Sequence, residues 1–382
     1  MSVLWDKDWR NKIALDSHSL KDVESFAKKL RNKDSSRAMQ QEISFYKKYF
    51  SIEQVILGLR TKDKSELNEF FNSIKHNLNN LLYIPEELEE YYKNVIAESE
   101  PNHREILEFL LQHGRKSKNF AQLKNYYKIV LGKFYSPVVA KCNKYASQYK
   151  HNVANKTLQE YEISTSLHYL QEKIKNNPAT LNLWGSNHEI DYFLKYNNRY
   201  GFGKFRSKAT TGLDNTFTVN CPDHRIDEND LHMQYLTNVY PGYGHFVNTQ
   251  FDNIDSRDID FGASFVFNGW STFAAWHIFP SLYTKSLKII NGKIVKHLFN
   301  TPSQKNFSQI YRLLINTFDR TIATKILRQI SQMPGKFESR FLGAIATEIV
   351  IDKGFALNPN NYLTRLRTCD ITNYFTPLKK LK

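Results

Sequence analysis

The stretch NFAQLKNYYKIVLGKFYSPVVAKCNKYASQY, residues 119–149, carries the clearest helical pattern of the chain. Its apolar side chains recur three and four positions apart beside a row of lysines, as one face of an α-helix requires. The stripe consists of Leu123, Tyr126, Tyr127, Val130, Leu131 and Phe134. Proline lacks the amide hydrogen that a helix interior uses, so we expect a kink at Pro137. This stretch alone favours a helical fold.

The same spacing continues on both sides of this stretch. Before it, we expect helices over residues 20–30, 41–50, 52–59, 67–82, 86–97 and 104–113, with Ser19 and Ser51 as N-caps. After it, we expect helices over residues 158–175, 228–240, 262–284, 304–332 and 338–353. Short β-prone runs lie at residues 202–206 and 215–220. The sequence therefore predicts a mainly α, multi-helix fold with a small β element near residues 200–220.

The composition agrees with a folded helical protein. A chain of 382 residues can bury one large core or two smaller ones. Phe 26 and Tyr 22 supply bulky core side chains, which argues against general disorder. Glycine and proline are scarce, at 15 and 11, and this disfavours a loop-rich β fold.

Targeting signals and cysteine pairs are not apparent in the sequence. No apolar run approaches the roughly 20 residues of a membrane span. The first residues, MSVLWDKDWRNK, lack the apolar core of a signal peptide. Cys142, Cys221 and Cys369 lie too far apart in the sequence to indicate a disulfide framework or a cysteine metal site. We expect a cytoplasmic protein with no membrane partner, and the oligomeric state stays open.

The net charge of +15 is concentrated in two helical stretches. Residues 101–150 carry ten Lys or Arg against two Asp or Glu, and residues 301–382 carry thirteen against five. Such runs are typical of solvated helix faces, or of a basic patch that binds nucleic acid or an acidic partner. No zinc finger or helix-turn-helix spacing accompanies them, so nucleic-acid binding is the weaker alternative.

Three segments of the second half recur together in a known family. They are NTFTVNCP at residues 215–222, leading through a helix to VYPGYGH at 239–245; FVFNGWSTFAA at 265–275; and MPGKFESRFLG at 333–343. Their order, spacing and flanking helices resemble the bacterial domain-of-unknown-function family numbered eight-eight-five. Members of that family look like helical gluzincin-type metallopeptidases. The resemblance covers about residues 200–376 and implies a zincin-like architecture. It divides the chain into a helical region, 1–195, and a peptidase-like region, 196–382, which can form one continuous domain.

The resemblance also implies where a metal site would be. The family pattern is an HExxPGHH stretch, an EGW…Y.E helix and a PGQ…Y segment, whose imidazoles and carboxylates hold a divalent ion that activates water. The matching positions here are Thr237, Asn238, Asn268, Ala275 and Arg340, with His245 one residue late. Amides and hydroxyls are weak ligands for zinc. We therefore expect no metal, no cofactor and no metal-dependent peptidase activity.

The remaining polar side chains near the inferred cleft are candidates for catalysis. They are His245, His277, Arg340 and Tyr243. His245 and His277 could join a carboxylate such as Glu348 or Asp255 in a rebuilt metal or acid/base site. Alternatively, each histidine serves only a turn or a helix end.

Arg340 replaces a tyrosine of the family pattern. Its guanidinium could bind a carboxylate or phosphate bidentately. Alternatively, it is a partly buried arginine paired with Glu338 or Glu348. The candidate ligand-binding residues are Asn238, Tyr240, Asn268 and Trp270, although Trp270 also suits a core position.

Two other segments read as structural. Asp223, His224 and Arg225 form a polar loop that could orient a substrate, but a solvated turn explains them as well. His232 has the neighbour spacing of an ordinary amphipathic helix, and Cys221 suits a small buried thiol. The sequence contains no P-loop and no nucleophile elbow.

These observations lead to three hypotheses. The first is a non-metallo derivative of the peptidase-like fold that binds a peptide or small-molecule ligand, as a pseudoenzyme or regulatory partner. The second is a repurposed enzyme that acts on a small metabolite or peptide intermediate through the four catalytic candidates. The third is a protein that binds nucleic acid or an acidic partner through its basic helices.

Overall fold

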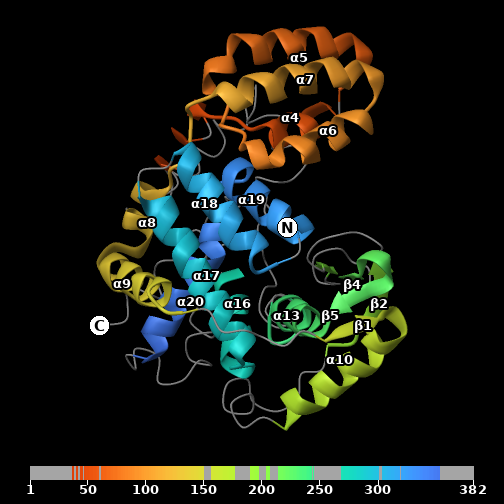
Figure 1. Cartoon of the computed structure of the whole chain (residues 1–382), viewed down its shortest axis with the longest axis vertical. Helices are drawn as coiled ribbons and strands as arrows, with labels where there is room; N and C mark the ends of the chain where they lie inside the picture. The colour runs from red at the N-terminus through yellow and green to blue at the C-terminus, as the bar shows by residue number, and fades with distance from the viewer. Residues whose placement is uncertain are drawn as a thin grey trace. The chain divides into compact units, whose positions relative to one another are not determined.

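The fold was obtained as a computed structural model (Figure 1). It describes residues 37, 40–41, 44–45, 47–59, 62–149, 156–176, 190–197, 204–206, 214–242, 244, 268–300, 303–318 and 320–352. Two compact units appear, each assembled from separated segments of the chain. The first takes its described residues from within Met1–Tyr135 and Ile294–Glu338. The second takes them from within Ser136–Asp255, Ala263–Lys293 and Ser339–Lys382.

The first unit is built mainly from helices, with isolated β-bridges between Phe50 and Leu81 and between Leu82 and Asn119. Its elements are α4 (Ile52–Leu59), α5 (Lys64–His76), α6 (Glu89–Ala97), α7 (Pro101–Lys116), α8 (Lys124–Leu131), α18 (Gln304–Ile315) and α19 (Arg320–Gln332), with short 3-10 turns at Leu78–Asn80, Glu86–Leu88 and Gly132–Phe134. Helix α7 packs against α4 and α6, and α18 packs against α19. The apolar faces of these helices are buried, as burial of one stripe per helix requires.

The second unit adds two small sheets to its helices. Its elements are α9 (Tyr135–Ala146), β1 (Thr157–Gln159), α10 (Glu160–Lys175), β2 (Phe193–Asn197), β3 (Lys204–Arg206), β4 (Thr216–Asn220), β5 (Arg225–Asp227), α13 (Glu228–Asn238) and α16 (Gly269–Ile278). Strand β4 lies between β2, which is parallel to it, and β3, which is antiparallel. Strands β1 and β5 form an antiparallel pair. Helices α17 (Leu282–Phe299) and α20 (Lys336–Asp352) supply residues to both units.

The mainly α prediction is confirmed, and so is the small β element near residues 200–220. Helix α4 has the predicted bounds, and Ser51 caps it. The Ser51 amide donates to Gln54 Oε1 at 2.7 Å, and the Gln54 amide donates to Ser51 Oγ at 3.3 Å. This reciprocal pair satisfies two amides that the first helical turn leaves without acceptors.

The expected kink at Pro137 is wrong. The stretch 119–149 breaks at Gly132, whose φ of +49° ends α8, and a new helix starts at Tyr135. Pro137 lies in the first turn of α9, where backbone amides have no intrahelical acceptor and a proline loses no hydrogen bond. The helix therefore breaks at Gly132, because glycine tolerates a positive φ.

Two other long helices are each divided. The predicted helix over 262–284 is described from Asn268 onward as α16, an irregular link containing Pro280, and the start of α17. The predicted helix over 304–332 is interrupted after Ile315, where the amide of Thr317 donates to the Leu314 carbonyl in a tighter turn. The helix expected over 20–30, with its cap at Ser19, lies outside the described residues. The division at residues 195 and 196 rests on sequence alone and stays a prediction.

Within the described ranges, every helix is too short or too polar to cross a bilayer.

Candidate functional site

The end of α13 carries the positions that match the family's first motif. Gly242 lies so close to this helix that a Cβ there would be 2.2 Å from the Thr237 carbonyl oxygen. The chain therefore folds back sharply after Tyr240. Thr237 Oγ1 donates to the Met233 carbonyl at 2.6 Å, and Asn238 Nδ2 donates to the Gln234 carbonyl at 2.8 Å. Both side chains thus bond to their own helix.

Helix α16 carries the second motif and lies against α20. A Cβ at Gly269 would be 2.7 Å from the Cα of Gly343, so the two backbones touch. Trp270 is 1% exposed and packs against Phe273 at 5.8 Å between ring centroids. Trp270 therefore occupies a core position in the second unit.

The residues at the family's metal positions do not fit a zinc ion. Thr237 and Asn238 donate hydrogen bonds to carbonyls of their own helix. Ala275 is fully buried, and its methyl side chain has no atom that can bind a metal. Across the described ranges, no three His, Cys, Asp or Glu side chains are grouped so that they could hold a metal ion. We derive no metal-dependent step from this arrangement.

Arg340 lies one turn before Gly343 on the same face of α20. Three residues of an α-helix rise about 4.5 Å, so the Cα of Arg340 lies about one turn from the contact between Gly343 and the first turn of α16. Its side chain is partly buried, and this burial lowers the pKa of the guanidinium. The positive end of the α16 dipole lies nearby, and the first turn of α16 contains no acidic residue. This corner of the second unit is therefore electropositive.

The two carboxylates expected to pair with Arg340 are engaged elsewhere. Glu338 is 4% exposed, and its Oε2 accepts from the Gly335 amide at 3.1 Å. Glu348 binds Lys288 at 3.2 Å and Lys141 at 3.4 Å. No carboxylate within the described part of the chain forms an ion pair with Arg340.

Glu348 is the centre of a closed polar network. Besides the two lysines, Tyr145 donates to Glu348 Oε1 at 3.0 Å. Lys141 also binds Asp352 at 2.7 Å. Lys288 lies over the rings of Trp276 and Tyr145, at 5.1 and 5.6 Å from their centroids. The two cations balance the two carboxylates, so this network supports the packing of α9, α17 and α20.

His277 lies at the other end of α16 from Arg340. The residue is partly accessible to solvent, and one face of its ring stacks on Phe273 with 5.6 Å between the ring centroids. Burial and Lys288 lower the pKa of His277, whereas the charges of Asp352 and Glu348 raise it by less. Among the described residues, no hydrogen bond or ion pair joins His277 to Glu348, so the acid/base site suggested for this pair stays a prediction. From Gly269 to His277 the helix rises about 12 Å, which separates His277 from Arg340.

The other predicted site residues lie as follows. Asn238 and Tyr240 are partly buried at the end of α13, and burial raises the pKa of Tyr240 to about 12. Asn268 is the N-cap residue of α16. His245, Tyr243 and Asp255 lie outside the described residues.

A cluster around His232 was missed by sequence reasoning. Ser166 Oγ lies 3.0 Å from His232 Nε2 and donates to Glu228 Oε1 at 3.2 Å. Lys156 lies 3.2 Å from the same carboxylate oxygen. Ser166 and His232 are separated by 66 positions, so no local pattern could reveal the pair.

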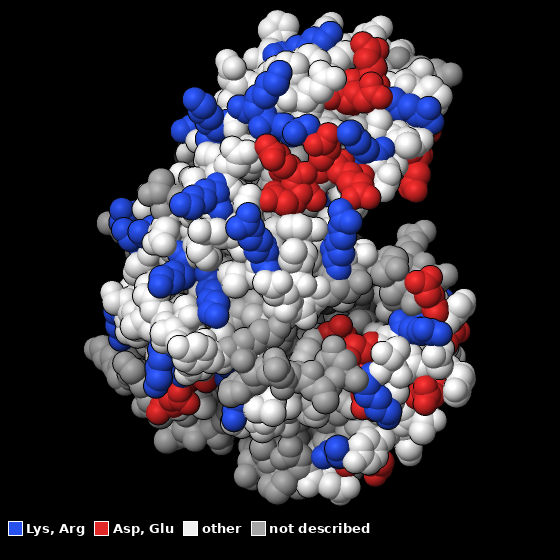
Figure 2. All heavy atoms as spheres, in the orientation of Figure 1, with Lys and Arg blue, Asp and Glu red and all other residues white. Residues whose placement is uncertain are grey.

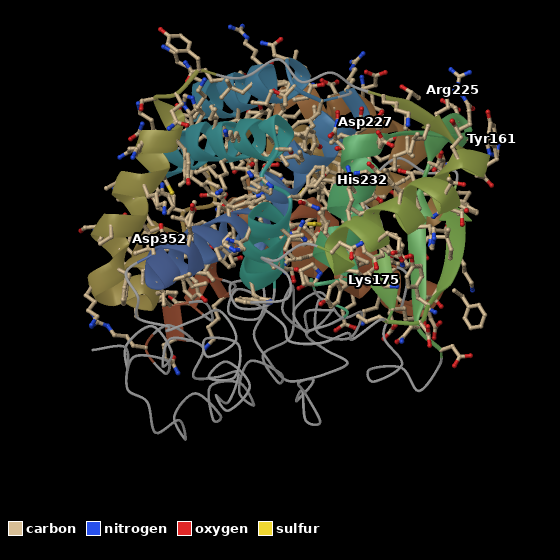
Figure 3. The ribbon with its side chains drawn as sticks, turned by 90° about the horizontal axis from the view of Figure 1, so that it is seen from below. Tyr161, Lys175, Arg225, Asp227, His232 and Asp352 are labelled. Carbon is tan, nitrogen blue, oxygen red and sulfur yellow. The ribbon has the colours of Figure 1, made fainter. Side chains whose placement is uncertain are left out.

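The hydrogen bonds of this cluster argue against a serine nucleophile. A carboxylate only accepts, so Ser166 gives its single proton to Glu228 and accepts one from His232 Nε2. The imidazole then offers the serine no free lone pair, which a general base needs. Both side chains are 7% exposed, and burial lowers the pKa of His232. Figure 3 shows His232 and Asp227 well apart from Asp352 on α20, so the cluster is distinct from the Glu348 network.

The basic residues of the first unit are partly neutralised. Figure 2 shows acidic side chains gathered over α6, with cations beside them. Glu89 binds Arg115 at 2.7 Å and Lys93 at 2.9 Å, and Glu90 binds Arg320 at 2.7 Å. These pairs remove part of the charge that suggested a nucleic-acid surface on the helices.

Comparisons with known proteins identify no family for this chain. No protein-family model matches the chain, and no curated protein matches it. A crystal structure of a "putative lipoprotein" from Colwellia psychrerythraea is similar, with a TM-score of 0.48 and 8% sequence identity. The match covers 85% of this chain and 66% of that chain. Likeness at this level carries no functional argument for this chain.

Proposed function

We propose that this protein binds an anionic ligand, a peptide carboxylate or a small carboxylate- or phosphate-bearing molecule, beside Arg340 in its second unit. The proposal extends the resemblance to the eight-eight-five family, whose fold would here be used without a metal. In this account the protein is a binding or regulatory protein rather than a peptidase.

The proposal rests on one observation: Arg340 is partly buried, and no carboxylate among the described residues forms an ion pair with it. A partly buried guanidinium loses part of its hydration, and an anion placed opposite it would compensate this loss. The two candidate counter-charges, Glu338 and Glu348, are occupied by other donors. An anionic ligand would supply the missing charge, and the planar guanidinium suits bidentate binding of a carboxylate or phosphate.

The position of Arg340 adds a second source of affinity. Gly269 and Gly343 bring the first turn of α16 against α20, one turn from Arg340. A helix N-terminus attracts anions through its dipole. His277 lies about 12 Å away at the opposite end of α16, so the two side chains would contact different parts of a ligand. This spacing favours binding of an extended molecule over joint catalysis on one group.

Calorimetric titration tests the proposal with tri-alanine, the same peptide as its C-terminal amide, and inorganic phosphate. We expect binding of tri-alanine or phosphate, and binding of the amide weakened at least tenfold because the carboxylate charge is absent. Arg340→Gln should abolish binding, whereas Arg340→Lys should retain part of it, since lysine keeps the charge without the fork. Equal binding of peptide and amide, or full binding by Arg340→Gln, would refute the role of Arg340.

A further inference from the structure

One face of the three-stranded sheet is separate from the Arg340 corner. Phe217 and Val219 on β4 are fully buried, and Phe217 packs against Tyr235 of α13 at 6.0 Å. Side chains alternate between the two faces of a strand, so Thr216, Thr218 and Asn220 point to the opposite face. These three are partly exposed. The sheet therefore has one core face and one outer face (Figure 1).

The strand register determines which residues share the outer face. Phe193 on β2 and Arg206 on β3 both lie opposite Thr216, and Lys195 lies opposite Thr218. Phe193 is 63% exposed, and Lys195 and Arg206 are also exposed. Strands lie about 4.8 Å apart, so Phe193 and Arg206 are separated by about 10 Å across Thr216, with Lys195 about 7 Å along β2 from Phe193.

The three strands themselves carry only basic charges, whereas two exposed carboxylates, Asp191 and Asp214, lie just before β2 and β4. The three strands read FLKYN, KFR and TFTVN and contain no Asp or Glu. Among the described residues of the outer face, Lys195 and Arg206 are the exposed cations. Lys195 and Arg206 form no ion pair with any residue that the structure describes. The outer face thus combines two cations without ion pairs, an exposed aromatic ring, and hydroxyl and amide groups, with two carboxylates at the edge where β2 and β4 begin.

We propose that this outer face binds single-stranded nucleic acid. A single strand presents unstacked bases, which stack on exposed aromatic rings, and phosphates, which bind Lys and Arg. Phe193 would stack on a base, Lys195 and Arg206 would bind the flanking phosphates, and Thr216 and Thr218 would hydrogen-bond between them. A duplex hides its base faces, so it would use the cations but not Phe193. This proposal differs from binding through the basic helices, because it depends on a sheet in the second unit.

Fluorescence anisotropy with the full-length protein tests this proposal. The probes are labelled U12 RNA, dT12 DNA and a 12-base-pair DNA duplex at 50 and 150 mM salt. We expect both single strands to bind more tightly than the duplex, and the RNA and DNA arms to identify the preferred sugar. Phe193→Ala should weaken single-strand binding roughly 5- to 100-fold, as loss of one stacked base does. Phe193→Leu, which keeps apolar area without a π face, should weaken it nearly as much.

Charge variants separate this face from a general basic effect. Lys195→Gln and Arg206→Gln should each reduce the slope of log affinity against log salt by about 0.7, as loss of one phosphate contact to a single strand does. Lys144→Gln removes the same charge from the exposed side of α9 and should leave the slope unchanged. Thermal melting of each variant verifies folding.

Several outcomes would overturn the inference. They are no binding of either strand at 50 mM salt, binding undiminished in folded Phe193→Ala, or equal losses in Lys144→Gln and Lys195→Gln. Poly-glutamate that binds as tightly as U12, and does so independently of Phe193, would assign the face to an acidic protein partner instead.

Discussion

At the residue scale, the decisive observations concern which charges have partners. The family resemblance singled out Arg340 because it replaces a tyrosine, and the sequence offered Glu338 and Glu348 as its partners. Their true contacts come from Gly335, Lys141 and Lys288, the last two of which are distant in sequence from Glu348. Whether a charged side chain has an ion-pair partner depends on residues that are distant in sequence. The sequence could therefore single out Arg340 but could not show whether a carboxylate pairs with it.

Glu338 gives a residue-scale prediction. Burial raises its pKa from 4.5 to about 7. A raised carboxyl pKa means that the folded state binds the proton more tightly than the unfolded state does. The stabilisation of the fold by protonated Glu338 is therefore complete below pH 4.5 and is lost as pH rises through 7. Glu338→Gln should therefore remove this loss and be more stable than the wild type at pH 8, by on the order of 3 kcal/mol.

Urea unfolding at pH 5 and pH 8 measures this difference. The exposed Glu105→Gln is the matched control, and it should change stability little at either pH. A Glu338→Gln protein with the same pH dependence as the wild type would show that Glu338 is ionised in the fold.

At the element scale, apolar spacing gave most helices and failed at their interruptions. Helix α4 was predicted with its bounds because its apolar run begins directly after Ser51, a residue that favours the N-cap position. The break at Gly132 was missed because Val130, Leu131 and Phe134 continue the buried stripe across it. The spacing of apolar residues predicts which side chains are buried. It does not predict a backbone turn, such as the one at Gly132, that leaves the same side chains buried.

The α8–α9 break leads to a prediction that compares two substitutions. Gly132→Ala should destabilise the protein by about 1–3 kcal/mol, because φ +49° and ψ −122° are unfavourable for a residue with a Cβ. Pro137→Ala should cost less than about 1 kcal/mol, because the proline lies in the first turn of α9 and acts mainly on the unfolded chain.

Denaturant unfolding of both variants measures these values. The opposite order, with Pro137→Ala the more damaging, would mean that the proline determines the bend.

At the scale of the whole molecule, two units share α17 and α20. The eight-eight-five resemblance lies in segments of α13, α16 and α20, and its glycines have packing roles: Gly242 against α13 and Gly269 against Gly343. Close backbone approach accounts for glycine at both positions, and the relation to that family stays a prediction. The Ser166–His232 pair and the outer face of the sheet depend on contacts between distant segments, so the sequence did not reveal them.

The thermal stability of Arg340→Met shows whether the Arg340 guanidinium lacks a counter-charge in the free protein and binds an anion. An uncompensated, partly buried charge destabilises the free protein, so the variant should melt a few degrees higher than the wild type without ligand. With phosphate or tri-alanine present, the wild type should gain stability by mass action and the variant should not. A variant that melts lower than the wild type without ligand would show that Arg340 already has a structural partner, and it would contradict the account.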